Sequence, residues 1–196
     1  DAKLPTGFWD AEAVPHNTVR LTAVEVYDGS DAQGGILELG IPVCETTNGY
    51  RVNVLQKIPL NMDRDNVTPA FLRAIEAALL NHVADRLSSE EAASPWAQEA
   101  AGDARATPEA VTAVIAKRFG EKAVIATPGD PMANAAAEAA GYTVIPGGAL
   151  SADAWANVRK HEVLLPASKV FPSLTPENQA KLQAMKATCP TCGQPV

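Results

Sequence analysis

The sequence has few of the residues that build disulfide frameworks, metal centres or aromatic platforms. It contains 3 cysteines and 3 histidines in 196 residues, and aromatic residues make up 5% of the chain. Three cysteines cannot form a closed set of disulfides, which is typical of a chain in a reducing compartment. The histidines lie far apart and none belongs to a zinc-protease motif. These scarcities argue against a disulfide-stabilised secreted scaffold.

Long apolar runs and clusters of positive charge are also missing. No run approaches the roughly 20 apolar residues that a membrane-spanning helix needs, and no basic segment followed by an apolar one marks a signal peptide. The net charge of −7 argues against a face with enough Lys and Arg to neutralise many phosphates. We therefore expect a cytoplasmic protein with no membrane contact and no general nucleic-acid binding. The chain opens at Asp1 without a methionine, and we expect it to be a piece of a longer protein.

The first third of the sequence has the alternation typical of β-strands. Between Val19 and Lys57, the stretches VRLTAVEVYD, GILELGIPVCETT and RVNVLQ are separated by turn residues. The dipeptide Asn48-Gly49 lies between the last two stretches, and Asn-Gly is the strongest short signal for a β-hairpin. We therefore predict a mostly antiparallel sheet with a hairpin at this dipeptide.

After Arg64 the apolar spacing changes to three and four residues, which predicts one buried face of a long helix. The residues of that face are Phe71, Leu72, Ile75, Leu79, His82, Val83 and Leu87. A Thr or Asp followed by Pro is a strong helix start, because the side chain caps the helix and Pro has no amide that needs a partner. This pattern predicts four helix starts, at Thr68, Thr107, Asp130 and Thr175.

The second half of the sequence alternates short strands with helices. We expect strands at 123–127 and 142–146, and helices at 131–140 and 151–160. Strand and helix alternation at this spacing is typical of a parallel sheet covered by helices. The sequence therefore predicts a small α/β unit in this half.

Together these patterns predict an α+β fold in three parts. We place the first boundary in the polar, alanine-rich stretch 88–106. The first part, 1–98, is then a mostly antiparallel sheet with a long helix. The second part, 99–165, is a small α/β three-layer unit. The third part, 166–196, is an extended Pro-rich tail with one short helix.

The segment QKIPLNMDRDN (56–66) places two cations, Lys57 and Arg64, between the last predicted strand and the long helix. Asp63 and Asp65 flank Arg64 and can orient its guanidinium while the donor groups face outward. One interpretation is an ordinary loop arginine paired with its neighbours, which adds little stability. The other interpretation is that both cations are held towards an anionic group.

Part of this segment, PLNMDRD (59–65), resembles the signature Pro-Leu-Asn-x-(Ser/Asp)-Arg-(Glu/Asp) in the middle domain of the ninety-kilodalton heat-shock chaperones. These chaperones are Bergerat-fold (GHKL) ATPases, a class that includes the gyrase-type topoisomerases. The predicted strand, helix and strand of 122–146 are also similar to the α/β part of that domain. The resemblance covers about residues 19–165 and implies a middle, or transducer, domain. It also implies that ATP and Mg bind in a separate N-terminal domain of the same protein.

The resemblance implies roles for individual residues of the segment. Arg64 takes the position of the catalytic arginine that reaches the γ-phosphate of ATP, and Asn61 takes that of the preceding asparagine. Lys57 is similar to the loop lysine of the gyrase branch. Thr68 departs from the family, which usually has Gln at its position. A guanidinium that reaches the transferring phosphoryl group only when two domains close can accelerate hydrolysis by roughly 10³–10⁵.

The chain contains no Asp-x-Gly-x-Gly motif and no Gly-rich ATP lid. We therefore expect that this chain alone binds no cofactor and hydrolyses no ATP. The resemblance implies that the parent protein is an ATP hydrolase and that its partners include a client protein.

The alternative is a non-catalytic protein-protein interaction module with a zinc-binding C-terminal extension. Cys189 and Cys192, in CPTCG, form half of a zinc ribbon and are the candidate metal ligands. Free or oxidised thiols are the other interpretation of this pair.

Overall fold

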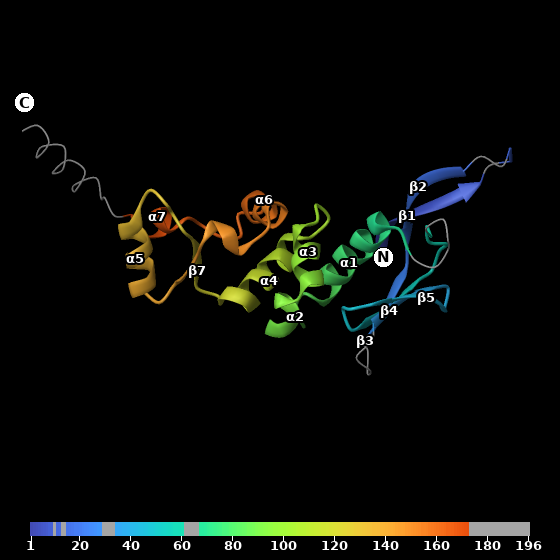
Figure 1. Ribbon diagram of the computed structural model, residues 1–196, viewed down its shortest axis with the longest axis horizontal. Helices are drawn as coiled ribbons and strands as arrows, with labels where there is room; N and C mark the ends of the chain where they lie inside the picture. The colour runs from blue at the N-terminus through green and yellow to red at the C-terminus, as the bar shows by residue number, and fades with distance from the viewer. Residues whose placement is uncertain (10, 13–14, 29–33, 61–66, 173–196) are drawn as a thin grey trace, which may run out of the picture. The chain divides into compact units, whose positions relative to one another are not determined.

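The structure is a computed structural model, drawn in Figure 1. The chain divides into two compact units. The residues that the structure describes are 1–9, 11–12, 15–28, 34–60 and 67–172. Unit 1 comprises Asp1–Glu121 and Leu150–Val163, and unit 2 comprises Lys122–Ala149 and Leu164–Val196. Strands and helices occur in both units, so the predicted α+β class is confirmed.

The strands of unit 1 form two sheets. Their bounds are β1 (Ala2–Trp9), β2 (Pro15–Thr22), β3 (Val24–Asp28), β4 (Gly34–Glu38), β5 (Ile41–Thr46) and β6 (Tyr50–Val54). β1 and β2 pair antiparallel, and the other four strands form a sheet in the order β3-β6-β4-β5. In that sheet β3 with β6 and β4 with β5 are antiparallel, whereas β4 with β6 is parallel. The prediction of a mostly antiparallel sheet is therefore confirmed.

The hairpin predicted at Asn48-Gly49 is wrong, because β5 and β6 are not neighbours. The chain leaves β5, passes the start of β4 and continues as β6 on the other side of β4. The crossing requires Gly34, where an added Cβ would lie 2.6 Å from Thr46 Oγ1 and 2.7 Å from the Tyr50 carbonyl oxygen. Asn48 is buried and its Oδ1 accepts hydrogen bonds from the Thr46 hydroxyl and from Tyr50 N. The turn therefore carries the chain across a strand.

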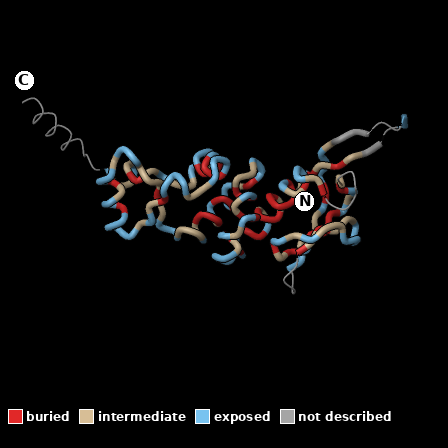
Figure 2. The backbone as a smooth tube through the Cα atoms, viewed as in Figure 1, coloured by how far each residue is buried: buried red, intermediate tan, exposed pale blue. Residues whose placement is uncertain are grey.

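Buried residues from several helices of unit 1 and from the four-stranded sheet form one core cluster. Figure 2 colours the buried residues of the chain red. Their bounds are α1 (Pro69–Val83), α2 (Ser89–Ala93), α3 (Pro95–Gly102), α4 (Pro108–Phe119) and α6 (Ala152–Lys160). The predicted starts at Thr68 and Thr107 are confirmed, since each side chain accepts a hydrogen bond from the backbone N–H three residues further on. Buried side chains of α1 and of the sheet belong to one cluster that includes Phe71, Ile75, Leu80, Ile36, Val52 and Val54. His82, predicted on the buried face of α1, is exposed instead.

The stretch 88–106, in which we predict a domain boundary, folds as α2 and α3. A capping box between Ser88 and Glu91 starts α2. Trp96 of α3 is buried, and its ring lies 6.1 Å from the Tyr50 ring in an edge-to-face arrangement. The alanines that suggest a linker are core residues, namely Ala92, Ala97, Ala100 and Ala101. The predicted boundary at residue 98 thus lies within α3, and unit 1 continues to residue 121 before the chain enters unit 2.

Unit 2 contains the small parallel sheet that the strand and helix alternation predicts. Its elements are β7 (Ala123–Ile125), α5 (Pro131–Ala139), β8 (Thr143–Ile145), the 3₁₀ helix η1 (Gly147–Ala149) and α7 (Ala167–Val170). β7 and β8 pair in parallel, and Asp130 caps α5 as predicted.

Residues 166–172, predicted to begin an extended tail, belong to this unit instead. Ile125 N donates a hydrogen bond to the Leu165 carbonyl oxygen over 2.9 Å, and Pro166 pairs with Ile125 in parallel. Ala167 of α7 is buried in the core of the unit. The helix start predicted at Thr175 lies outside the described residues.

Glu76 gives the first prediction, because it is a carboxylate on the buried face of α1, with 9% of its surface exposed. Burial, together with the charge of Glu99, raises the pKa of Glu76 from 4.5 to about 7. Since the folded-state pKa is the higher one, the free energy of unfolding should fall as the pH rises from about 5 to about 8. We predict that the fall in the free energy of unfolding between these two pH values is smaller by about 1–3 kcal/mol in Glu76→Gln than in the wild type, after allowance for solvent screening. Urea unfolding at both pH values measures this difference.

The control is Glu90→Gln, at an exposed carboxylate of α2. It should leave the pH dependence of stability as in the wild type. The same pH dependence in Glu76→Gln as in the wild type would show that Glu76 is not the group responsible.

Gly34 provides a test of the strand crossing. Gly34→Ala should lower the free energy of unfolding by about 2–3 kcal/mol, because its Cβ meets backbone as well as side-chain atoms. Gly35→Ala is the matched control, since the nearest atom to its Cβ is the Cys44 carbonyl oxygen at 3.2 Å. Equal losses in the two variants, measured by urea unfolding, would contradict the crossing.

Candidate functional site

The candidate site is the junction between β6 and α1, to which the sequence assigns Lys57, Asn61 and Arg64. Residues 61–66, including Asn61 and Arg64, lie outside the described residues. The side chain of Lys57 is exposed. The geometry of the junction therefore comes from the residues on either side of 61–66.

The two ends of the segment 61–66 join backbone that is paired. Leu60 and Val67 form an isolated antiparallel bridge. Thr68 N donates a hydrogen bond to the Pro59 carbonyl oxygen over 3.2 Å. Val67 is also buried, with 6% of its surface exposed. The segment therefore begins and ends at neighbouring points of the fold.

Side chains from three different strands hold the backbone of this junction. Thr6 of β1 is buried, and its hydroxyl donates a hydrogen bond to the Lys57 carbonyl oxygen over 2.8 Å. The Glu38 carboxylate, at the end of β4, accepts one from Ile58 N over 2.8 Å. Burial raises the pKa of the Cys44 thiol in β5, and hydrogen bonds from the backbone, including that of Val67, oppose the shift. We call Thr6, Glu38 and Cys44 the junction clamp.

The junction clamp holds the backbone at Lys57, whereas the Lys57 side chain is exposed. A lysine carries its charge on a flexible stem, so in an ordinary loop both the backbone and the side chain of a lysine can move. Here Ile58, the next residue, is 2% exposed and belongs to the core. The cation therefore extends from a fixed point beside the segment 61–66.

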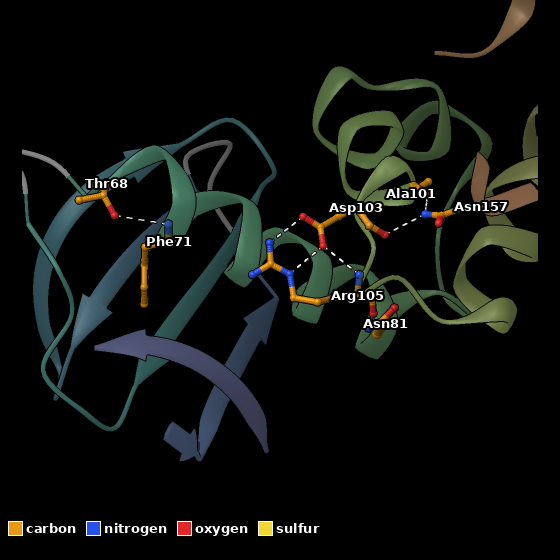
Figure 3. Close-up of polar contacts among 7 residues, drawn as sticks. All are labelled: Thr68, Phe71, Asn81, Ala101, Asp103, Arg105 and Asn157. Atoms are coloured by element: carbon orange, nitrogen blue, oxygen red, sulfur yellow. Dashed lines mark hydrogen bonds and ion pairs between the residues drawn. The ribbon is translucent and has the colours of Figure 1, made fainter. Parts of the chain in front are cut away.

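The N-terminus of α1 forms the other side of the junction (Figure 3). Thr68 Oγ1 accepts a hydrogen bond from Phe71 N over 3.4 Å, and Phe71 is fully buried. The capped helix presents the positive end of its dipole at the point where the segment 61–66 ends. A helix N-terminus of this kind favours a negative charge near it.

Further along α1, a polar network joins the helix to the loop before α4 (Figure 3). Asn81 Nδ2 donates to the Arg105 carbonyl oxygen over 2.9 Å, and Asn81 Oδ1 accepts from Thr107 N over 2.8 Å. Arg105 donates from Nε and Nη2 to the Asp103 carboxylate, at 2.7 and 2.6 Å. These hydrogen bonds hold the pKa of Asp103 below its usual value. The amide of Asn81 thus fixes the start of α4 to α1.

The same loop is also held from α6. Asn157 is buried, and its Nδ2 donates to the carbonyl oxygens of Ala101 and Asp103, each over 2.8 Å. No sequence motif marks this network, since hydrogen-bonded partners within it lie up to 56 residues apart. The only local signal is an Asn inside each of two helical patterns, at Asn81 and Asn157, where Asn is unfavourable without a partner.

Within the described ranges, no group of three or more His, Cys, Asp or Glu side chains is placed to hold a metal ion. Cys189 and Cys192 lie outside those ranges, so the zinc site stays a prediction. No helix that the structure describes is long and apolar enough to cross a membrane.

No protein-family model matches the chain, and no curated protein or solved structure with which it was compared matches it either. The likeness to the chaperone middle domain thus remains that of a short motif at a junction between a sheet and a helix.

Thr68 allows a direct test of the helix cap at the junction. Thr68→Ala removes the oxygen that accepts from Phe71 N and should lower the free energy of unfolding by about 1 kcal/mol. Thr68→Ser keeps that oxygen and should stay close to the wild type. Urea unfolding measures both variants, and equal losses in the two would mean that the hydroxyl does not cap α1.

Proposed function

We propose that this chain is the middle, or transducer, domain of a heat-shock-chaperone-like GHKL ATPase. In this function Arg64 reaches the γ-phosphate of ATP that is bound, with Mg, in a separate N-terminal domain of the same protein. Asn61 lies beside that phosphate, and Lys57 supplies a second cation. The observation that carries the proposal is the exposed side chain of Lys57 on a clamped backbone, next to the segment that contains Arg64.

The chemistry of phosphoryl transfer explains why a clamped junction suits this function. Catalysis of this reaction consists mainly of positioning and of stabilising the charge on the phosphoryl oxygens. A cation that arrives from another domain must therefore extend from a backbone that does not move independently. At Lys57, hydrogen bonds from two strands meet this requirement.

The contacts of α1 support a role in transmitting movement. The helix has 15 residues, which corresponds to a length of about 22 Å. Its first turn lies at the junction, and Asn81 near its end is hydrogen-bonded to the loop before α4. A helix anchored at both ends moves as one body, so a displacement of the junction would reach α4. This is the behaviour that a transducer requires.

The order of elements along the chain also supports the proposal. A sheet is followed by a long helix and later by a small parallel α/β unit, as in the family that PLNMDRD resembles. A cytoplasmic location and a client protein as a further partner belong to the same proposal.

A non-catalytic interaction module is the second candidate function. β2 exposes Val19 and Leu21, which are 61% and 66% exposed and lie two residues apart on one face of the strand. Exposed apolar residues grouped in this way favour a surface that another protein covers. In this candidate Lys57 and Arg64 have no role in ATP hydrolysis, and this is the difference that separates the two functions.

The ATPase proposal predicts the effect of removing each cation in the full-length protein. Arg64→Ala should lower the turnover number for ATP by roughly 10³-fold, because the charge on the transferring phosphoryl group loses its partner. Arg64→Lys should restore only part of this loss, since an ammonium lacks the planar set of donors. Lys57→Ala should cause a smaller loss of the same kind. Steady-state hydrolysis measures turnover, and equilibrium binding measures the Kd for ATP, which should be nearly unchanged.

Lys122→Ala, at an exposed lysine of unit 2, serves as the control and should behave as the wild type. A large rise in the Kd for ATP with unchanged turnover per bound nucleotide would refute the role of Arg64. Unchanged turnover in both Arg64→Ala and Lys57→Ala would favour the interaction module.

A further inference from the structure

The peptide group between Lys57 and Ile58 is held at both of its polar atoms. Its carbonyl oxygen accepts the hydrogen bond from the Thr6 hydroxyl over 2.8 Å. Its N–H donates to the Glu38 carboxylate, also over 2.8 Å. Thr6 and Glu38 are separated from this peptide by 51 and 20 residues along the chain. Two distant strands therefore hold one peptide plane.

Holding both atoms of a peptide group fixes the two backbone dihedrals beside it, namely ψ of Lys57 and φ of Ile58. A rotation of the plane would break both hydrogen bonds at once, and the one to a carboxylate is of the stronger, charge-assisted kind. The Cα of Lys57 lies in this peptide plane, and ψ of Lys57 sets the direction of its Cα–Cβ bond relative to the plane. Thr6 and Glu38 therefore determine where the exposed side chain of Lys57 starts and which way it leaves the fold.

Neighbouring contacts strengthen this arrangement. Gln56 Nε2 donates to the Pro5 carbonyl oxygen over 3.3 Å, so β1 contacts two consecutive residues of the junction. Leu4 and Ile58 are both buried in the core of unit 1. Thr6 is 6% exposed, so water does not readily replace its hydroxyl as the partner of the peptide oxygen. The hydrogen bonds belong to a packed part of the fold.

We propose that Thr6 and Glu38 are positioning residues that direct Lys57 towards the γ-phosphate of ATP in the neighbouring domain. This inference rests on the proposed function, and it assigns to β1 and β4 a part in the phosphate site. Neither residue touches the nucleotide. Each acts through the 57–58 peptide, so its contribution depends on the presence of the Lys57 side chain.

A double-mutant cycle in the full-length protein tests this dependence. Thr6→Val removes the hydroxyl at nearly constant volume, and Glu38→Leu removes the acceptor. Each should lower the turnover number on the order of tenfold, because small displacements of a positioned group are costly in rate. The Kd for ATP should not change. In the Lys57→Ala background neither substitution should lower turnover further.

The conservative variants separate positioning from general damage. Thr6→Ser keeps a hydroxyl and Glu38→Gln keeps a carbonyl acceptor, so both should retain turnover close to that of the wild type. Since Thr6→Val and Glu38→Leu act on opposite atoms of one peptide, either variant is sufficient if the other fails to fold.

Two outcomes would overturn the inference alone. One is the same fold-loss from Thr6→Val or Glu38→Leu whether or not Lys57 is present. The other is a clear loss in Lys57→Ala with none in Thr6→Val and Glu38→Leu. Unchanged turnover in Lys57→Ala would instead remove the role of Lys57 in the proposed function, and the positioning role with it.

Discussion

Two hydrogen bonds hold the peptide group between Lys57 and Ile58, and they depend on a strand crossing at the other end of the sheet. β4 and β6 are parallel neighbours, so their carboxyl ends meet at one edge, and this brings Glu38 beside the peptide that follows β6. β6 is the neighbour of β4 because the chain crosses the start of β4 after β5, where Gly34 leaves room for the turn. A hairpin between β5 and β6 would have paired β6 with β5, away from β4. The position of Glu38 beside the candidate site therefore depends on this strand crossing.

The long helix connects this edge of the sheet to the rest of unit 1. The Thr68 cap fixes where α1 begins, and Asn81 attaches it to the loop before α4. Between these points α1 buries Glu76, and burial together with the charge of Glu99 raises the pKa of this carboxyl to about 7. A buried carboxylate reduces stability near neutral pH, and natural helices rarely place one on an apolar face.

The sequence predicts the parts of this fold that local signals determine. The Thr-Pro starts at Thr68 and Thr107 and the small parallel unit are found where the pattern places them, because capping and strand-helix alternation act over a few residues. The sequence does not predict the strand order, because a turn at Asn48-Gly49 can join two neighbouring strands or carry the chain across a strand between them. The partners of Lys57 could not be predicted, because Thr6 and Glu38 carry no motif and are brought to it only by the folded sheet. Asn61 and Arg64, to which the resemblance gives roles, lie outside the described residues.

We propose that the junction between β6 and α1 faces the terminal phosphate of a nucleotide bound in the parent protein. Crosslinking of the full-length protein with an ATP analogue that carries a short photoreactive group on its γ-phosphate tests this placement. The labelled peptides are then identified by mass spectrometry. We expect a label on the peptide that contains Lys57 and Arg64, and we expect excess ATP to suppress it. Labelling confined to other parts of the protein, with none on that peptide, would contradict this placement.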